Sequence, residues 1–219
     1  MVCNGTGGRR HLIYSPHDPI AMRIALRREM RQRRRGLQNF RRLLADHALA
    51  RHLVNLPAYR RARNLAVYWP ADGEADVRAV AAHAWSSGKR LYLPVVGHGG
   101  KMHFAPWKRS ARLRPNRFGI PEPARFLQRV SARRLDLVVM PLVAFDDRGN
   151  RLGMGGGYYD RALGGQRRRP LLVGAAYSFQ QVPSIPAQPW DVPMNVVITE
   201  RGRRTMRRSP SPGSGGAEQ

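Results

Sequence analysis

A cluster of glycines between an apolar run and the start of a helix constrains this chain more than any other feature. Four of the residues 153–157 are glycine, the apolar residues 138–141 come before them, and a helix is predicted to begin at Tyr158. A backbone without side chains lets N–H groups approach a ligand, and a helix N-terminus adds the positive end of its dipole. Residues 150–161 therefore predict either a phosphate-binding loop or a tight turn.

The spacing of the glycines excludes two common nucleotide-binding motifs. A Walker loop needs G-x-x-x-x-G-K-[ST], which is absent, and a dinucleotide fingerprint would need glycine where Tyr158 stands. The histidines form no zinc motif, there is no G-x-S-x-G elbow, and the single cysteine is Cys3. The sequence therefore offers no good nucleophile and no zinc site.

Two acidic residues follow the glycines at informative places. Asp160 lies in the first turn of the predicted helix, where it either complements the helix dipole or holds Mg²⁺ beside bound phosphates. Asp191 lies in a proline-bounded segment before a strand and is the second candidate metal ligand. Asp146 and Asp147 are interpreted as turn formers.

The order of predicted elements indicates an α/β fold with a mostly parallel sheet. Strands at 65–69 and 90–96 flank a helix at 76–87, which is the βαβ rhythm. Further strands are predicted at 102–104, 135–140, 171–177 and 196–199. Helices are predicted at 20–35 and 37–55, and residues 106–134 are predicted to be mostly loop with one helical turn near Phe126. The inner side of the second helix is predicted to hold Leu43, Leu44, Ala48, Leu49, Leu53 and Val54.

The length of 219 residues and an apolar fraction of 42% predict one domain. We expect a disordered lead at 1–19 (with Met22 as an alternative start), the domain at 20–200 and a disordered basic tail at 201–219. No apolar run approaches the ~20 residues of a membrane helix, and no secretory signal is present. With one cysteine, the chain is expected to be a cytoplasmic protein without membrane partners, and a monomer is the default expectation.

The net charge of +25 predicts anionic partners, either polyanionic small molecules or nucleic acid, unless it reflects a general richness in arginine. The excess is densest towards the two ends of the chain. Arginines recur at three- and four-residue steps in the first helix, so they share one stripe that faces either an anion or solvent. The stripe consists of Arg23, Arg27, Arg31 and Arg34.

Residues 140–160, MPLVAFDDRGNRLGMGGGYYD, resemble the signature of the 5-formyltetrahydrofolate cyclo-ligases, also called methenyltetrahydrofolate synthetases. The basic first helix, residues 69–74, residues 119–123 and the pair Trp190-Asp191 follow in the family's order. The resemblance covers about residues 22–200. It implies ATP- and Mg²⁺-dependent closure of 5-formyltetrahydrofolate to 5,10-methenyltetrahydrofolate, on a three-layer α/β/α sandwich similar to the sugar-phosphate isomerase and CoA-transferase group.

The resemblance also implies roles for individual residues. ATP contacts are expected from the first helix and the glycine loop, at Arg23, Arg27, Arg151, Leu152, Gly153, Met154, Gly155, Gly156, Gly157, Tyr158 and Tyr159. Folate contacts are expected at Trp69, Glu74, Met154, Gly155, Gly156, Gly157 and Tyr158. The expected catalytic residues are Arg151 and Tyr158, and the expected magnesium ligands are Asp160 and Asp191. If these two residues bind no ligand, Trp69 could be a core residue and Glu74 could cap the next helix.

This chain departs from the family pattern at two places. Some members carry Lys or Arg within the glycine run, where this chain has Met154 and Gly156, so the charge facing phosphate falls to arginines elsewhere. Members often have His before the second acid and another acid four residues after it, where this chain has Trp190 and Asn195. Two other functions remain open: a nucleic-acid-binding protein that uses the arginine-rich ends, and another enzyme of the same fold, such as a phosphosugar isomerase.

Overall fold

The structure is a computed structural model that describes residues 18–124, 128–166 and 169–206. Residues 1–17, most of the expected disordered lead, lie outside the described residues, and so does the helical turn expected near Phe126. In the described part of the chain, no helix is long and apolar enough to cross a membrane.

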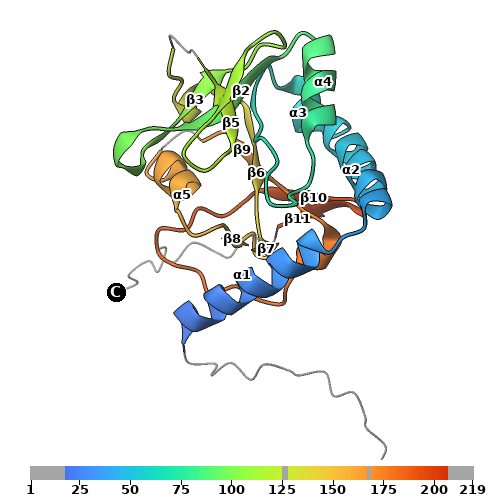
Figure 1. The fold of residues 1–219 in the computed structure, drawn as a ribbon, viewed down its shortest axis with the longest axis vertical. Coiled ribbons are helices and arrows are strands. Elements are labelled where there is room, and N and C mark those ends of the chain that lie inside the picture. Colours follow the sequence, from blue (N-terminus) through green and yellow to red (C-terminus); the bar gives the residue numbers. More distant parts are fainter. Residues whose placement is uncertain (1–17, 125–127, 167–168, 207–219) are drawn as a thin grey trace, which may run out of the picture.

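A seven-stranded, mostly parallel sheet forms the centre of the molecule (Figure 1). The strand order is β11-β10-β9-β6-β1-β2-β3, and only the edge strands β3 and β11 run antiparallel to their neighbours. The strands are β1 (Asn64–Ala66), β2 (Arg90–Val96), β3 (Met102–Pro106), β6 (Leu137–Pro141), β9 (Leu171–Ala175), β10 (Val196–Thr199) and β11 (Gly202–Thr205). The expected βαβ unit is confirmed, because β1 and β2 pair in parallel around an intervening helix.

Two small antiparallel ribbons and five helices complete the described fold. The ribbons are β4 (Leu113–Pro115) with β5 (Pro121–Pro123), and β7 (Ala144–Phe145) with β8 (Arg151–Leu152). The helices are α1 (Pro19–Arg35), α2 (Asn39–Val54), α3 (Pro57–Arg61), α4 (Arg78–Ser86) and α5 (Tyr158–Leu163). Short 3₁₀ turns are η1 (His98–Gly100), η2 (Ala132–Arg134) and η3 (Ser178–Gln180).

Both faces of the sheet are buried, each in its own apolar cluster. Successive side chains of a strand point to opposite faces. Leu137 and Val139 of β6 accordingly join one cluster, whereas Val138 and Met140 join the other. Helices α2, α3 and α4 cover the first face and α5 lies on the second (Figure 1). The expected three-layer α/β/α arrangement is confirmed.

Helix α1 packs apart from these layers, against the β7–β8 ribbon (Figure 1). Its N-terminus is capped by Asp18, whose Oδ1 accepts hydrogen bonds from the backbone of Ile20 and Ala21, and Pro19 takes the first helical position. Met30 is buried among residues of the ribbon and Ile185. The apolar face of α1 is narrow, and the arginines on the helix lie beside the loops around the ribbon.

Two expectations are wrong. Residues 202–205 form β11 and do not belong to a disordered tail, because their backbone pairs with β10; the rest of the tail, 207–219, lies outside the described residues. Leu43 and Leu44 are each 55% exposed, since α2 buries mainly its second half at Leu49, Ala50 and Leu53. Residues 106–134 are mostly loop where the structure describes them, as expected, and they also contain the β4–β5 ribbon.

Candidate active site

The glycine loop connects β8 to α5, and α5 begins at Tyr158 as expected. Gly155 has a φ of +103°, a conformation that side chains rarely adopt. At Gly156 the constraint is space: a Cβ there would lie 2.5 Å from Cε2 of the Tyr158 ring. The loop therefore requires glycine at these two positions to make its tight turn before α5.

Arginine side chains from α1 hold the loops on this side of the molecule. Arg27 donates from Nε to the carbonyl of Gly153 at 2.9 Å. Arg23 donates from Nη1 to the carbonyl of Pro186 at 2.6 Å and pairs with Oδ2 of Asp191 at 2.8 Å. Burial, followed by the charge of Arg23, lowers the pKa of Arg27. The first half of the predicted arginine stripe thus faces the glycine loop and the segment that carries Asp191.

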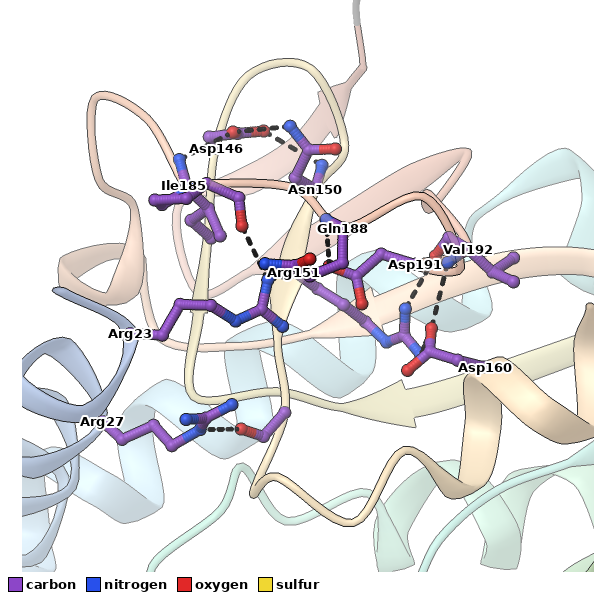
Figure 2. A network of polar contacts seen from close by, with 12 residues as sticks. Arg23, Arg27, Asp146, Asn150, Arg151, Asp160, Ile185, Gln188, Asp191 and Val192 are labelled. Carbon is purple, nitrogen blue, oxygen red and sulfur yellow. Dashed lines mark hydrogen bonds and ion pairs between the residues drawn. The ribbon is translucent and has the colours of Figure 1, made fainter. Parts of the chain in front are cut away.

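A third arginine, Arg151, links the acid of α5 to the same segment (Figure 2). Its Nη2 lies 2.8 Å from Oδ1 of Asp160, and its Nη1 donates to the carbonyl of Val192 at 2.6 Å. The backbone of Val192 donates in turn to Oδ1 of Asp160 at 3.0 Å. Arg151 is only 6% exposed, so its charge relies on this partner.

The carboxylates of Asp160 and Asp191 suit a hard cation bound together with phosphate. In the part of the chain that the structure describes, no group of three or more His, Cys, Asp or Glu side chains gathers as a metal site. Mg²⁺, however, usually takes one or two carboxylates and completes its shell with phosphate oxygens and water. The hydrogen bonds of the described residues use Oδ1 of Asp160 and Oδ2 of Asp191, and the second oxygen of each carboxylate is the candidate ligand.

One pocket of about 610 Å³ brings the loop and both acids together. It is lined by Gly155, Gly156, Gly157, Asp160, Arg161, Gly164, Gly165, Arg169, Pro189, Trp190, Asp191 and Val192. Arg161 and Arg169 were missed as site residues. Arg161 stands directly after Asp160 and donates to the carbonyl of Gly156 at 2.7 Å, so its place in the motif was the available signal. No pattern in the sequence points to Arg169.

Tyr158 connects the glycine loop to the β4–β5 ribbon. Its hydroxyl accepts a hydrogen bond from Nη2 of Arg117 at 2.9 Å, and its ring meets Phe118 edge to face at 6.0 Å. Asn116, in the same turn of the ribbon, donates to Glu122 at 3.2 Å. The turn of the ribbon therefore lies over the start of α5, beside the loop.

Trp69 and Glu74 lie at the end of β1, away from the two aspartates in sequence. Trp69 packs partly into the core and meets Trp107 edge to face at 5.8 Å, while the guanidinium of Arg78 lies 5.8 Å from its ring centroid, which matches the core interpretation. Glu74 does not cap α4: its Oε2 accepts from the backbone of Ala71 at 3.1 Å, and the residue before α4 is Val77. Burial raises the pKa of Glu74 to about 7.

Tyr159 joins the two sides of the candidate site electrostatically. Burial and the neighbouring carboxylate of Glu74 raise the pKa of its hydroxyl, and Arg151 acts in the opposite direction. Tyr159, with its expected nucleotide role, thus lies close enough to Glu74, with its expected folate role, for the charge of Glu74 to act on it.

A family model described as the 5-formyltetrahydrofolate cyclo-ligase family matches residues 19–200. The chain belongs to this family. It is therefore an enzyme, and the match covers the domain that carries the pocket.

Curated members of the cyclo-ligase family support the assignment. The 5-formyltetrahydrofolate cyclo-ligase of Haemophilus influenzae is 39% identical over 177 residues, which cover 78% of this chain and 94% of the relative. The enzyme of the same name from Escherichia coli K12 is 37% identical over 174 residues, covering 78% and 96%.

Solved structures of the family share the fold. The 5,10-methenyltetrahydrofolate synthetase of Aquifex aeolicus matches with a TM-score of 0.75 and 34% identity, covering 90% of this chain and all of that one. The synthetase of Mycoplasma pneumoniae matches with a TM-score of 0.68 and 26% identity, covering 81% and 98%. Family and fold thus agree with the resemblance in the glycine-rich signature, while the roles of individual residues remain predictions.

Proposed function

We propose that this protein converts 5-formyltetrahydrofolate to 5,10-methenyltetrahydrofolate, using Mg²⁺ and ATP and releasing ADP and phosphate. The observation that carries the proposal is one pocket that joins the glycine loop to Asp160 and Asp191, with Arg23 and Arg27 holding its walls. The family match and the names of the relatives support the folate substrate.

The reaction needs activation of a poor leaving group. The formyl oxygen of the substrate takes the γ-phosphoryl group of ATP, the bond to ADP breaks, and the formyl carbon becomes electrophilic. N10 then attacks that carbon and loses its proton, and the carbon–oxygen bond breaks to release phosphate. Neither step needs a nucleophile from the protein, which agrees with a sequence that offers none.

In this proposal the chain supplies position and charge. Arg23, Arg27 and Arg151 order the loops, and the glycine loop brings backbone amides to the phosphates. The loop itself has Met154 where some members carry a cation, and in this chain Arg161 and Arg169 add positive charge to the pocket. Mg²⁺, held by Asp160 and Asp191, would neutralise phosphate charge.

The folate is proposed to lie between the glycine loop and the end of β1. Trp69 offers an aromatic surface to the flat pterin, and Glu74 accepts its N–H groups. Tyr158 and Arg151, the expected catalytic residues, act in this proposal at the shared border of the two substrates. The reaction is proposed to take place in the cytoplasm, because the single cysteine, Cys3, fits a reducing compartment, and a monomer is the default expectation.

The decisive experiment is turnover of 5-formyltetrahydrofolate, followed by the absorbance of the methenyl product. Purified protein is expected to form the product with Mg²⁺ and ATP, and to stop when ATP is omitted or Mg²⁺ is chelated. Absence of ATP-dependent conversion at saturating substrate would overturn the proposal. Isomerisation of a phosphosugar without ATP would support the other enzyme of the same fold.

A separate basic pocket favours a second candidate function, binding of nucleic acid. A cavity of about 550 Å³ at the amino ends of β1 and β2 is lined by basic side chains from α3 and the segments beside it. They are Arg60, Arg61, Arg63, Lys89 and Arg90. A fluorescent single-stranded RNA is expected to bind with a steep salt dependence that weakens in the triple variant Arg61→Gln, Arg63→Gln, Arg90→Gln. An unchanged affinity of this variant would reject the pocket, and loss on trimming residues 1–17 and 207–219 would favour the ends.

A further inference from the structure

The loop that presents Glu74 is a tight turn with an unusual residue in it. Asp72 has a φ of +50° and Gly73 a φ of +71°, and the backbone of Glu74 donates to the carbonyl of Ala71 at 2.9 Å. Two successive left-handed residues closed by this bond make a type I′ turn, which Asp-Gly favours. Among the described residues, Asp72 is the one non-glycine with positive φ, so the turn holds a conformation that its surroundings must support.

Three arginines of α1 converge on Asp72. Arg31 donates from Nε to its Oδ2 at 2.7 Å, and Arg35 pairs with its Oδ1. Arg34 makes the largest set of contacts: Nη2 to Oδ2 at 2.8 Å, Nε to the carbonyl of Asp72 at 2.9 Å, and Nη1 to the carbonyl of Leu142 at 3.3 Å. The second half of the arginine stripe thus faces an anion, and that anion is a side chain of the same protein.

Arg34 differs from the other two arginines in its burial. Its side chain is 1% exposed, against 37% for Arg31 and 59% for Arg35. A planar guanidinium that bonds a carboxylate oxygen and the carbonyl of the same residue fixes that residue in position and in orientation. Its third bond, to the carbonyl following β6, ties the turn to the central sheet.

The same helix holds the loops of the nucleotide side through Arg23 and Arg27. We propose that Arg34 is a positioning residue for the folate side of the site, which sets the place and charge of Glu74 through the Asp72 turn. This inference rests on the proposed function, and it adds a residue that touches neither substrate.

The charges around Glu74 agree with this role. Burial raises its pKa, and the charge of Arg34 is the largest influence in the opposite direction, ahead of the N–H of Ala71. Asp72 in the same turn raises the pKa, and the hydroxyls of Tyr68 and Tyr159 are the further titratable groups within range. Loss of the Arg34 charge is therefore expected to move the ionisation of Glu74 to higher pH.

The test compares four variants of the full chain: Arg34→Gln, Arg34→Lys, Asp72→Asn and Arg28→Gln. Asn tolerates a left-handed conformation, so Asp72→Asn keeps the turn and removes the charge to which Arg34 is bound. Lys keeps the charge of Arg34 but not its fork. Arg28 is an exposed arginine of the same helix and controls for loss of one positive charge.

For Arg34→Gln and Asp72→Asn, the KM for 5-formyltetrahydrofolate is expected to rise about tenfold, as for a lost charge-assisted contact, while the KM for ATP changes less than about threefold. The acid limb of the kcat/KM profile for folate is expected to move to higher pH in Arg34→Gln and to return towards the wild-type position in Arg34→Lys. Arg28→Gln is expected to match the wild type in both readouts.

Equal rises in both KM values, or an unmoved acid limb in folded Arg34→Gln, would overturn the inference. If Arg34→Gln does not fold, Asp72→Asn decides on the KM values, and the inference is overturned if the KM for folate does not rise or if both KM values rise equally. A wild-type protein without ATP-dependent turnover would instead overturn the proposed function, so the two failures are distinguishable.

Discussion

Arg151 and Asp160 form an ion pair at 2.8 Å that also organises the backbone of a third segment, since Val192 bonds to both side chains. The pair joins β8, α5 and the proline-bounded segment that carries Asp191. An acid with a candidate metal role is therefore also a structural partner of a nearly buried cation. Removing it tests chemistry and stability together, and the two must be separated by the choice of variant.

Asp160→Asn is expected to abolish most Mg²⁺-dependent turnover, with a loss of about 10²–10³-fold, because the charge that would face the metal is gone while an acceptor oxygen stays. Asp160→Ala is expected to destabilise the fold as well, by about 3 kcal/mol, since it leaves Arg151 buried without its partner. Urea unfolding and turnover at several Mg²⁺ concentrations measure the two effects. Normal turnover in folded Asp160→Asn would reject the metal role.

Arg27→Gln is expected to raise the KM for ATP by about tenfold, the effect of losing one charge-assisted contact. The physical reason is that Nε of Arg27 holds the carbonyl of Gly153, where the glycine loop begins. Steady-state kinetics with each substrate varied in turn give both KM values, and Arg28→Gln on the exposed side of α1 is the control. A rise confined to the folate KM would contradict this placement of Arg27.

Gly156→Ala is expected to lower the free energy of unfolding by about 1–3 kcal/mol, because its Cβ would overlap the Tyr158 ring and push it from Arg117. Gly153→Ala is the matched control in the same loop. A Cβ at Gly153 meets nothing within 4 Å and its φ is not left-handed, so the change is expected to be neutral or slightly stabilising. Chemical denaturation measures both variants, and equal losses would show that the space at Gly156 does not matter.

The stability difference between Glu74→Gln and the wild type is expected to depend on pH. The folded-state pKa of Glu74 is raised from 4.5 to about 7, so ionisation opposes folding. This penalty is absent below pH 4.5, grows between pH 4.5 and 7, and is complete above pH 7.

Glu74→Gln is therefore expected to gain stability relative to the wild type as pH rises through that window, by at most about 3 kcal/mol. Partial exposure of the side chain reduces the figure through solvent screening. Unfolding midpoints of both proteins at pH 4.5, 6 and 8 check the trend. A difference that stays constant, or that shrinks with rising pH, would show that the carboxyl group is not buried in its ionised form.

Much of the fold could be predicted because local sequence patterns indicate where its helices and strands begin and end. Strand β2 begins and ends where its apolar run does, and α5 starts directly after the glycines. Gly36 ends α1 as expected, at a break in helix-forming residues. The apolar periodicity of α2 was less informative. It places Leu43 and Leu44 on the apolar face of the helix, but it does not indicate how much of that face other elements cover.

The chain's own pattern determined the α/β class, the glycine loop, the two candidate acids and the arginine stripe, since each depends on residue type and short spacing. Tertiary structure alone decided what the stripe faces. Arg34 meets Asp72 at a separation of 38 residues and Arg23 meets Asp191 at 168. Such pairs depend on the path of the chain through the sheet, and an arginine favours any carboxylate or carbonyl that this path brings within reach, so spacing could not distinguish a ligand from a partner within the protein.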